Sequence, residues 1–395
     1  MASLQRQRLL VTRTLPQASQ ARLDKGLEGV DVVQWKEDCA IPRAEFLKMA
    51  KGADGILCLL TDKIDAELLD AAGPQLKVVS TMSVGFDHVH VPELTSRNIA
   101  LGITPGVLTE ATADTTVLLV LASARRLREG MSAVINGEWG TWSPTWLLGS
   151  QLTDKTVGIV GLGRIGVAVA KRLKVFGVQK FLYQGTRPKK ESEEEVGGAI
   201  EFADMDRLLK ESDVICVCCA LTDKTKNMFD YNAFSKMKKS VVFVNTARGG
   251  IVEQDGLIRA LREGKLGSVG LDVTVPEPLP KDSELLSFPN CLVLPHIGSG
   301  TLETRTAMSE IAIENVLKGM RGERIPYPHN ALSHLRRLWD KVEGKIQLDE
   351  YRIWSKNAKV TSLIMTEEHR LNGTLQGSWQ AVGGCYSQKS IGSSS

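Results

Sequence analysis

The chain has 395 residues, more than one hydrophobic core usually serves, so its length favours two domains. Hydrophobic residues make up 43% and charged residues 24%, values typical of a soluble globular protein. The formal net charge is only +3 and no dense run of Lys and Arg occurs, which argues against nucleic acid as a partner.

Short apolar runs alternate with stretches of helical spacing from residue 8 to about residue 104. The expected strands are 8–12, 30–35, 55–60, 76–82 and 99–103, and helices are expected between them. Strands that alternate with helices predict a parallel sheet covered on both faces.

One long helix is then expected over residues 109–128. Thr109 is placed to cap its N-terminus, and Arg125 and Arg126 lie near its end, where the helix dipole favours cations. Its apolar middle predicts burial between domains or subunits. The apolar run 117–124 is far shorter than the ~20 residues of a membrane span, so no membrane association is expected.

A second alternating series begins at residue 156. Its expected strands are 156–161, 180–184, 214–220, 241–247, 268–273 and 291–295, and its expected helices include 164–176, 204–212, 255–264 and 302–320. The sequence therefore predicts an α/β protein with two doubly wound parallel sheets of the Rossmann or flavodoxin type.

Residues 327–395 show no sustained period and are expected to form an atypical C-terminal tail with little core of its own. The seven cysteines lie mostly in apolar runs, which predicts buried, reduced thiols rather than a metal site. No signal-peptide pattern is visible, so the expected location is the cytoplasm.

The segment "TVGIVGLGRIG" (156–166) has the strand–turn–helix context of a dinucleotide-binding turn. Gly161 would permit the tight turn, Gly163 would let the backbone approach a pyrophosphate, and Gly166 would let the helix pack on the strand. The helix N-terminus would offer N–H groups to the phosphates.

The end of the next strand distinguishes NAD(H) from NADP(H). An NAD(H) site places an acid there, whereas this chain has Gln184 followed by Thr186, Arg187, Lys189 and Lys190. Because an Arg can pair with a 2′-phosphate, NADP(H) is favoured and NAD(H) is the alternative.

Polar residues follow three further strands of this series. Arg248, Asp272, Glu277 and His296 come after the strands 241–247, 268–273 and 291–295. Since ligands of doubly wound folds bind at the carboxyl ends of strands, these side chains are expected to converge in one crevice.

In this order "GLGRIG", "NTARGG", "PEP" and "LPHIGS" resemble the D-2-hydroxyacid dehydrogenase family, over about residues 8–326. Within the family the likeness is strongest to members that reduce glyoxylate and hydroxypyruvate, through "STMSVGFDH" (80–88) and "GEWGTWSPTWLLG" (137–149). The resemblance implies a discontinuous substrate domain (1–106 and 299–326) and a dinucleotide-binding domain (107–298). It also implies NADPH-dependent reduction of a small keto acid to a hydroxy acid.

The resemblance also implies roles for individual residues. Arg248 would bind the substrate carboxylate, His296 would protonate the keto oxygen, and Glu277 would hydrogen-bond His296. Further substrate contacts are implied for Val84, Gly85, Ser299 and Trp142. The implied cofactor contacts are Gly161, Gly163, Arg164, Ile165, Gly166, Thr186, Arg187, Pro188, Lys189, Ala220, Thr246, Asp272 and Gly298. No metal is implied.

The resemblance further implies a homodimer, in which Trp142, or else Trp146, would reach the partner's substrate site; simple packing of these aromatics is the alternative. Two other readings stay open. One is another D-2-hydroxyacid dehydrogenase, such as a phosphoglycerate-type or formate enzyme. The other is a nicotinamide-sensing corepressor-like binding protein, which would favour an acid where Gln184 stands.

Overall fold

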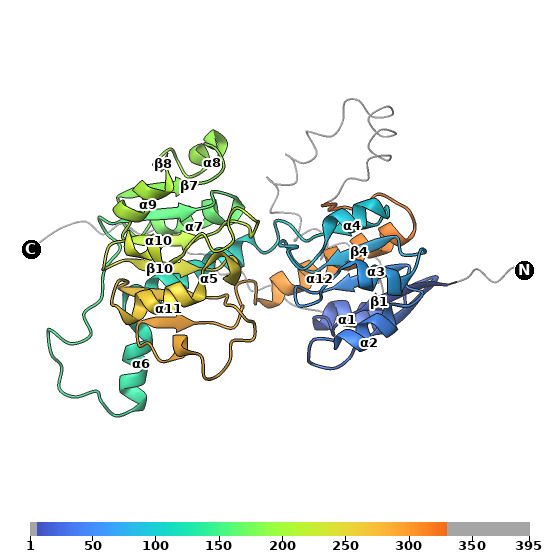
Figure 1. Ribbon diagram of the computed structural model, residues 1–395, viewed down its shortest axis with the longest axis horizontal. Helices are drawn as coiled ribbons and strands as arrows, with labels where there is room; N and C mark the ends of the chain where they lie inside the picture. Colours follow the sequence, from blue (N-terminus) through green and yellow to red (C-terminus); the bar gives the residue numbers. More distant parts are fainter. Residues whose placement is uncertain (1–5, 330–395) are drawn as a thin grey trace, which may run out of the picture. The chain divides into compact units, whose positions relative to one another are not determined.

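The computed structural model describes residues 6–329, and most of the expected tail therefore lies outside the described residues. The elements, labelled in Figure 1, are in chain order β1 (Gln7–Val11), α1 (Gln17–Asp24), β2 (Val30–Gln34), α2 (Arg43–Ala50), β3 (Gly55–Cys58), α3 (Ala66–Ala72), β4 (Val78–Thr81), α4 (Val91–Ser96), β5 (Ala100–Gly102), α5 (Thr109–Ala124), α6 (Leu127–Ile135), β6 (Thr156–Val160), α7 (Arg164–Lys174), β7 (Lys180–Gln184), α8 (Lys190–Glu195), β8 (Ile200–Phe202), α9 (Met205–Glu211), β9 (Val214–Val217), α10 (Tyr231–Ser235), β10 (Val242–Asn245), the 3₁₀ turn Gly249–Ile251, α11 (Gln254–Arg262), β11 (Ser268–Leu271), the 3₁₀ turn Glu284–Leu286, β12 (Cys291–Val293) and α12 (Leu302–Met320).

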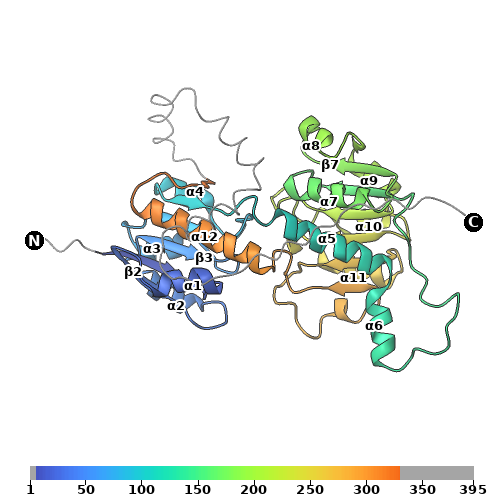
Figure 2. The same ribbon diagram turned by 180° about the vertical axis from the view of Figure 1, so that it is seen from behind.

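The first five strands form a sheet in the order β2-β1-β3-β4-β5, with every neighbouring pair parallel. Helices α1 and α12 supply the core on one face, and α2, α3 and α4 supply it on the other. Figures 1 and 2 both show α12, drawn in orange, among the blue elements of this sheet. This return of the chain supports the discontinuous substrate domain, whose boundaries near residues 106 and 299 we propose.

The other seven strands form a second parallel sheet, in the order β12-β11-β10-β9-β6-β7-β8. Helices α5 and α7 cover one face, and α9, α10 and α11 cover the other. Successive strands are added outward from β6 to β8 on one side and from β9 to β12 on the other, so the strand order reverses between β6 and β9. Doubly wound folds bind their ligands at this point. The predicted α/β class with two doubly wound parallel sheets is confirmed.

The central strands are buried along their whole length, as expected for parallel strands covered on both faces. Every residue of β3, β4, β9, β10 and β11 is buried, so their apolar runs carry no alternation. The short edge strand β8 and the acidic helix α8 were not expected from the sequence, because neither has a sustained apolar period.

The single helix expected over 109–128 is wrong, because the chain breaks there into α5 and α6. Arg126 adopts a left-handed conformation with φ of +54°, which ends one helix and redirects the next. Thr109 is the first helical residue rather than the cap, and Leu108 occupies the cap position without a side-chain hydrogen bond.

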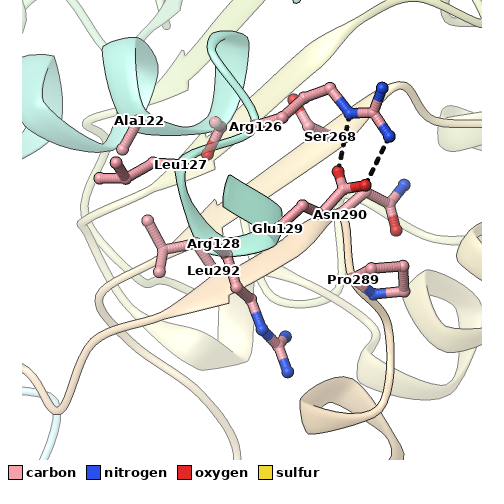
Figure 3. Close-up of a pocket in the computed structure, with 10 residues that line it drawn as sticks. Ala122, Arg126, Leu127, Arg128, Glu129, Ser268, Pro289, Asn290 and Leu292 are labelled. Atoms are coloured by element: carbon pink, nitrogen blue, oxygen red, sulfur yellow. Dashed lines mark hydrogen bonds and ion pairs between the residues drawn. The ribbon is translucent and has the colours of Figure 1, made fainter. Parts of the chain in front are cut away.

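One local ion pair and three tertiary hydrogen bonds hold the chain in this break. Nη2 of Arg126 lies 2.5 Å from Oε2 of Glu129, and Figure 3 shows this pair beside Asn290. Arg128 donates to the carbonyl of Phe288 at 2.7 Å and also to those of Leu286 and Cys291. The cavity drawn in Figure 3 is only about 10 Å³, too small for a cofactor or substrate.

The first residues of the expected tail pack on the edge of the first sheet. Pro328 forms an antiparallel bridge with Gly102, and the backbone N–H of His329 donates to the carbonyl of Leu101 at 2.8 Å. The ring centroid of His329 lies 3.7 Å from that of Phe86. Residues 327–329 therefore extend the folded part, while residues 330–395 lie outside the described residues.

The six cysteines in the described part are unpaired, and Cys58, Cys216 and Cys291 are buried, whereas Cys39 is exposed. Burial raises the pKa of Cys216 to about 12, so this thiol stays protonated at neutral pH. Within residues 6–329, no three His, Cys, Asp or Glu side chains are grouped to hold a metal ion. None of the helices described has the length and apolar character needed to cross a bilayer.

Candidate active site

The glycine-rich turn follows β6 and leads into α7. Gly161 has φ of +98°, and a Cβ there would lie 2.7 Å from the backbone N and Cα of Cys219. A Cβ on Gly166 would overlap the carbonyl oxygen of Gly161. Only glycine fits these two positions, one because of its φ and the crowding, the other because helix and strand approach so closely.

The remaining features of this turn fit a dinucleotide. Gly163 precedes the first residue of α7, and no heavy atom lies within 4 Å of a Cβ built on it, so space is open at this point. No side chain caps α7, which leaves the N–H groups of its first turn free for an anion. Arg164 and Ile165 lie in this first turn.

The loop after β7 brings a cation back to the glycine-rich turn. Nζ of Lys189 donates to the carbonyl oxygen of Leu162 at 3.1 Å, while Thr186, Arg187 and Pro188 are exposed. Residues 184–190 contain no Asp or Glu. The edge where an adenosine ribose would lie is therefore cationic and open.

His296 and Glu277 meet after strands β12 and β11. Nδ1 of His296 lies 2.7 Å from Oε2 of Glu277, whose other oxygen accepts the backbone N–H of Thr274 at 3.0 Å. Burial would raise the pKa of Glu277, but the hydrogen bond and charge of His296, together with the N–H of Thr274 and the charge of Arg248, lower it overall. An ionised carboxylate only accepts hydrogen bonds, so Nδ1 carries a proton and Nε2 is the ring nitrogen that Glu277 does not engage.

The lowered pKa of Glu277 links this pair to stability. Because the folded pKa lies below the ordinary carboxyl value, the stabilisation is present above that ordinary value. It is lost as the pH falls through the folded pKa.

Asp272 fixes the backbone on which His296 stands. Its two carboxylate oxygens accept the N–H groups of Ile297 and Gly298, each at 2.8 Å, and its carbonyl accepts the N–H of His296 at 2.9 Å. His296 has φ of +54°, a strained value for a residue other than glycine. Burial raises the pKa of Asp272 although the two N–H groups act to lower it. These bonds hold the strained turn in place.

Arg248 reaches from the loop after β10 to the loop after β4. Its Nε donates to Oδ1 of Asp87 at 2.8 Å, and its Nη1 donates to the carbonyl of Ala247 at 2.9 Å. A Cβ on Gly85 would overlap Nη2 of Arg248, so only glycine lets the guanidinium lie this close.

The expected crevice residues thus form one connected set. Gly85 contacts Arg248, whose charge acts on Glu277, and Glu277 holds His296, which Asp272 positions through the backbone. Two other expected residues are held by hydroxyl groups of α5. Thr115 donates to the carbonyl of Gly298 at 3.3 Å, and the hydroxyls of Thr246 and Thr116 lie 2.7 Å apart.

Within residues 6–329, the expected residues Val84, Ser299, Ala220 and Trp142 form no hydrogen bond or ion pair with this set. Val84 is half-buried in the loop that carries Gly85, and Ser299 is half-buried with its carbonyl accepting Nε of Arg305 at 3.2 Å. Ala220 is exposed, and its carbonyl accepts the Thr225 hydroxyl at 2.7 Å. Trp142 is 79% exposed.

Asp87 was missed by the sequence reading. It is 161 residues from Arg248 along the chain, and no spacing rule pairs two residues so far apart. The available signal was its place in "SVGFDH", two positions after Gly85, on a loop already expected to bind substrate.

A glycine-rich turn where the strand order of a parallel sheet reverses, together with a His–Glu pair and a guanidinium that follow other strands of the same sheet, defines the class of nicotinamide-dependent dehydrogenases. Comparison with known proteins agrees. Residues 117–298 match the profile of the D-isomer specific 2-hydroxyacid dehydrogenase, NAD binding domain. The human glyoxylate reductase/hydroxypyruvate reductase is 48% identical over 319 residues, which cover 81% of this chain and 96% of that protein.

Two solved structures extend this likeness. The NADPH-dependent glyoxylate/hydroxypyruvate reductase from Sinorhizobium meliloti, in complex with NADP and malonate, has a TM-score of 0.69 at 31% identity, covering 82% of this chain and 96% of that one. The D-lactate dehydrogenase from Aquifex aeolicus, complexed with NAD and lactic acid, has a TM-score of 0.69 at 28% identity, covering 80% and 96%. The chain belongs to the D-isomer specific 2-hydroxyacid dehydrogenase family. It is an NAD(P)-dependent oxidoreductase that acts on CH–OH groups.

Proposed function

We propose that this protein uses NADPH to reduce glyoxylate and hydroxypyruvate to glycolate and D-glycerate. The observation that carries the proposal is the 2.7 Å His296–Glu277 pair on the same connected set of loops as Arg248. The relatives named as glyoxylate and hydroxypyruvate reductases support the choice of substrate.

In this proposal the chain's residues bind the keto acid and manage its proton. Nη2 of Arg248 and the backbone N–H groups of Val84 and Gly85 bind the carboxylate, and Ser299 lines the same site. His296 donates the proton on Nε2 to the keto oxygen as negative charge develops there, and Arg248 stabilises that charge. Glu277 accepts the hydrogen bond of Nδ1 and so keeps the imidazole oriented.

The glycine-rich turn and the loops beside it would hold the cofactor. A bound nicotinamide supplies the hydride. The pyrophosphate would lie against Gly161, Gly163, Arg164, Ile165 and Gly166, and the adenosine phosphate against Thr186, Arg187, Pro188 and Lys189. Ala220, Thr246, Asp272 and Gly298 would line the nicotinamide half.

The proposed function is tested by the loss of NADPH absorbance when glyoxylate, hydroxypyruvate, pyruvate or phosphohydroxypyruvate is added to purified protein. We expect turnover with the first two. Turnover of phosphohydroxypyruvate alone would replace the proposal with a phosphoglycerate-type enzyme, and no turnover with tight NADH binding would favour the corepressor-like reading.

Replacing Arg187 with Ala is expected to raise the KM for NADPH by about 10- to 100-fold, because a charge-assisted hydrogen bond to the 2′-phosphate is worth about 1.5–3 kcal/mol. The KM for NADH is the internal control, since NADH lacks that phosphate and should bind unchanged. Equal losses for both cofactors would show that Arg187 does not read the 2′-phosphate.

We also propose that the protein is a homodimer. Exposed apolar side chains gather on α6 and the segment after it, including Met131, Val134, Ile135, Trp139 and Trp142. A monomer rarely exposes such a group, and a second copy would cover it and bring Trp142 to the partner's substrate site.

The unpaired cysteines of residues 6–329 agree with a cytoplasmic location, which we also propose.

Replacing Ile135 with Asp is expected to shift the protein from dimer to monomer in light scattering, because a buried unpaired carboxylate opposes association. The same change at Val175, which is 83% exposed on another element, is the matched control and should leave the mass unchanged. A wild-type monomer, or a dimer that survives Ile135→Asp, would contradict this surface.

A further inference from the structure

Arg248 is held by its neighbours so that one of its three nitrogens is singled out. Nε is bonded to Asp87 and Nη1 to the carbonyl of Ala247, while Nη2 lies over Gly85. A guanidinium on a flexible stem has many rotamers, and two fixed nitrogens leave it with one orientation.

The loop that carries Asp87 is itself held by side-chain hydrogen bonds. A chain of hydrogen bonds runs from Nε2 of His88 to Thr81 at 3.0 Å, from Thr81 to Ser83 at 2.8 Å, and from Ser83 to the carbonyl of Gly85 at 2.6 Å. Burial lowers the pKa of His88 to about 4, so its ring is neutral at pH 7. The carboxylate of Asp87 therefore projects from a fixed backbone.

The position of Asp87 is electrostatically unfavourable for substrate binding, and stability alone does not explain it. Burial would raise its pKa, but the charge and hydrogen bond of Arg248 lower it, so Asp87 is an anion at neutral pH. That anion lies on the loop proposed to receive an anionic carboxylate, where it repels the substrate. A partly exposed ion pair contributes little to the free energy of folding, so a gain in stability does not offset this repulsion.

We propose that Asp87 is a positioning residue for substrate recognition, which holds Nε of Arg248 so that Nη2 faces the keto-acid carboxylate above Gly85. This inference rests on the proposed function. The orientation of the guanidinium outweighs the repulsion because a carboxylate is bound strongly only when the donors are aligned in advance. Asp87 acts through Arg248 and does not itself touch the substrate.

The test compares Asp87→Ala with Asp87→Asn, which keeps an oxygen acceptor but loses the charge. We expect Asp87→Ala to raise the KM for the keto acid by about tenfold or more, with a smaller rise for Asp87→Asn. The NADPH affinity and Tm should stay unchanged. The binding of oxalate, a non-reacting carboxylate, to the NADPH complex should weaken in parallel with KM in a calorimetric titration.

The matched control is Asp70→Ala. Asp70 also pairs with an arginine, Arg97, at 2.6 Å, but Asp70 is exposed and lies on α3 outside the site, so its loss should leave KM unchanged. A double-mutant cycle separates positioning from direct action. In an Arg248→Lys background, which has no Nε, Asp87→Ala should change KM by less than about twofold.

The outcomes distinguish the two proposals. An inactive wild-type protein would overturn the proposed function. An active wild-type protein with normal KM and oxalate affinity in Asp87→Ala would overturn the role of Asp87 alone. Additive losses in the Arg248→Lys background would also overturn it, since Asp87 would then act independently of Arg248. If Asp87→Ala does not fold, Asp87→Asn decides by the same criteria.

Discussion

Replacement of His296 with Asn is expected to lower kcat for keto-acid reduction by about 10²- to 10⁴-fold, the usual contribution of a positioned general acid. The Asn side chain cannot donate an acidic proton from the place of Nε2, so charge on the keto oxygen develops without a proton. The measurement is steady-state NADPH oxidation with glyoxylate and hydroxypyruvate.

The NADPH affinity of this variant should be unchanged, because Asp272 holds the surrounding backbone through N–H groups that the substitution retains. His90→Asn, a substitution at an exposed histidine, is the matched control and should keep full activity. A kcat for His296→Asn within a few-fold of wild type would refute the assignment of His296 as the general acid.

Replacement of Arg248 with Ala should lower kcat/KM by about 10²- to 10³-fold, from the loss of charge-assisted hydrogen bonds worth about 1.5–3 kcal/mol each. The substitution also leaves Asp87 without its cation, next to the incoming carboxylate. Both effects oppose substrate binding, so the KM for the keto acid should rise steeply. Single-turnover and steady-state rates over a wide range of keto-acid concentrations would measure it.

Arg97→Ala provides the control for Arg248→Ala, because it removes an arginine that pairs with Asp70 and Glu93 and contacts none of the described residues of the proposed site. Its KM and kcat should match wild type. If Arg248→Ala behaves in the same way, the substrate carboxylate binds elsewhere and the arrangement of Gly85, Arg248 and Asp87 has another purpose.

The two large predictions test different parts of one geometry. His296 is proposed to donate the proton and Arg248 to bind the substrate carboxylate. His296→Asn should therefore lower mainly kcat, whereas Arg248→Ala should raise KM as well. A main effect on KM for His296→Asn and on kcat for Arg248→Ala would mean that the two roles are exchanged.

The sequence predicted the local parts of this protein well. The apolar runs that became β3, β4, β9, β10 and β11 are readable because a strand buried on both faces needs apolar residues throughout. The strand–turn–helix context around Gly161 was readable for a similar reason, since the need for glycine arises within a few residues.

The helix expected over 109–128 shows where local reading fails. Arg125 and Arg126 are good helix formers, and nothing near them in the sequence indicates a break. The break depends on Arg128 and three carbonyl groups about 160 residues further along the chain. Bonds of that range exist only after the sheet has formed.

The sequence by itself determined the fold class, and it predicted the dinucleotide turn and the candidate residues Arg248, Glu277 and His296, because each follows from a short pattern or from its place after a strand. Only the tertiary structure decided that Asp87 holds Arg248 and that Asp272 holds the strained turn at His296. Side-chain hydrogen bonds depend on which atoms meet within about 3 Å, and that distance is set by the packing of loops remote in sequence.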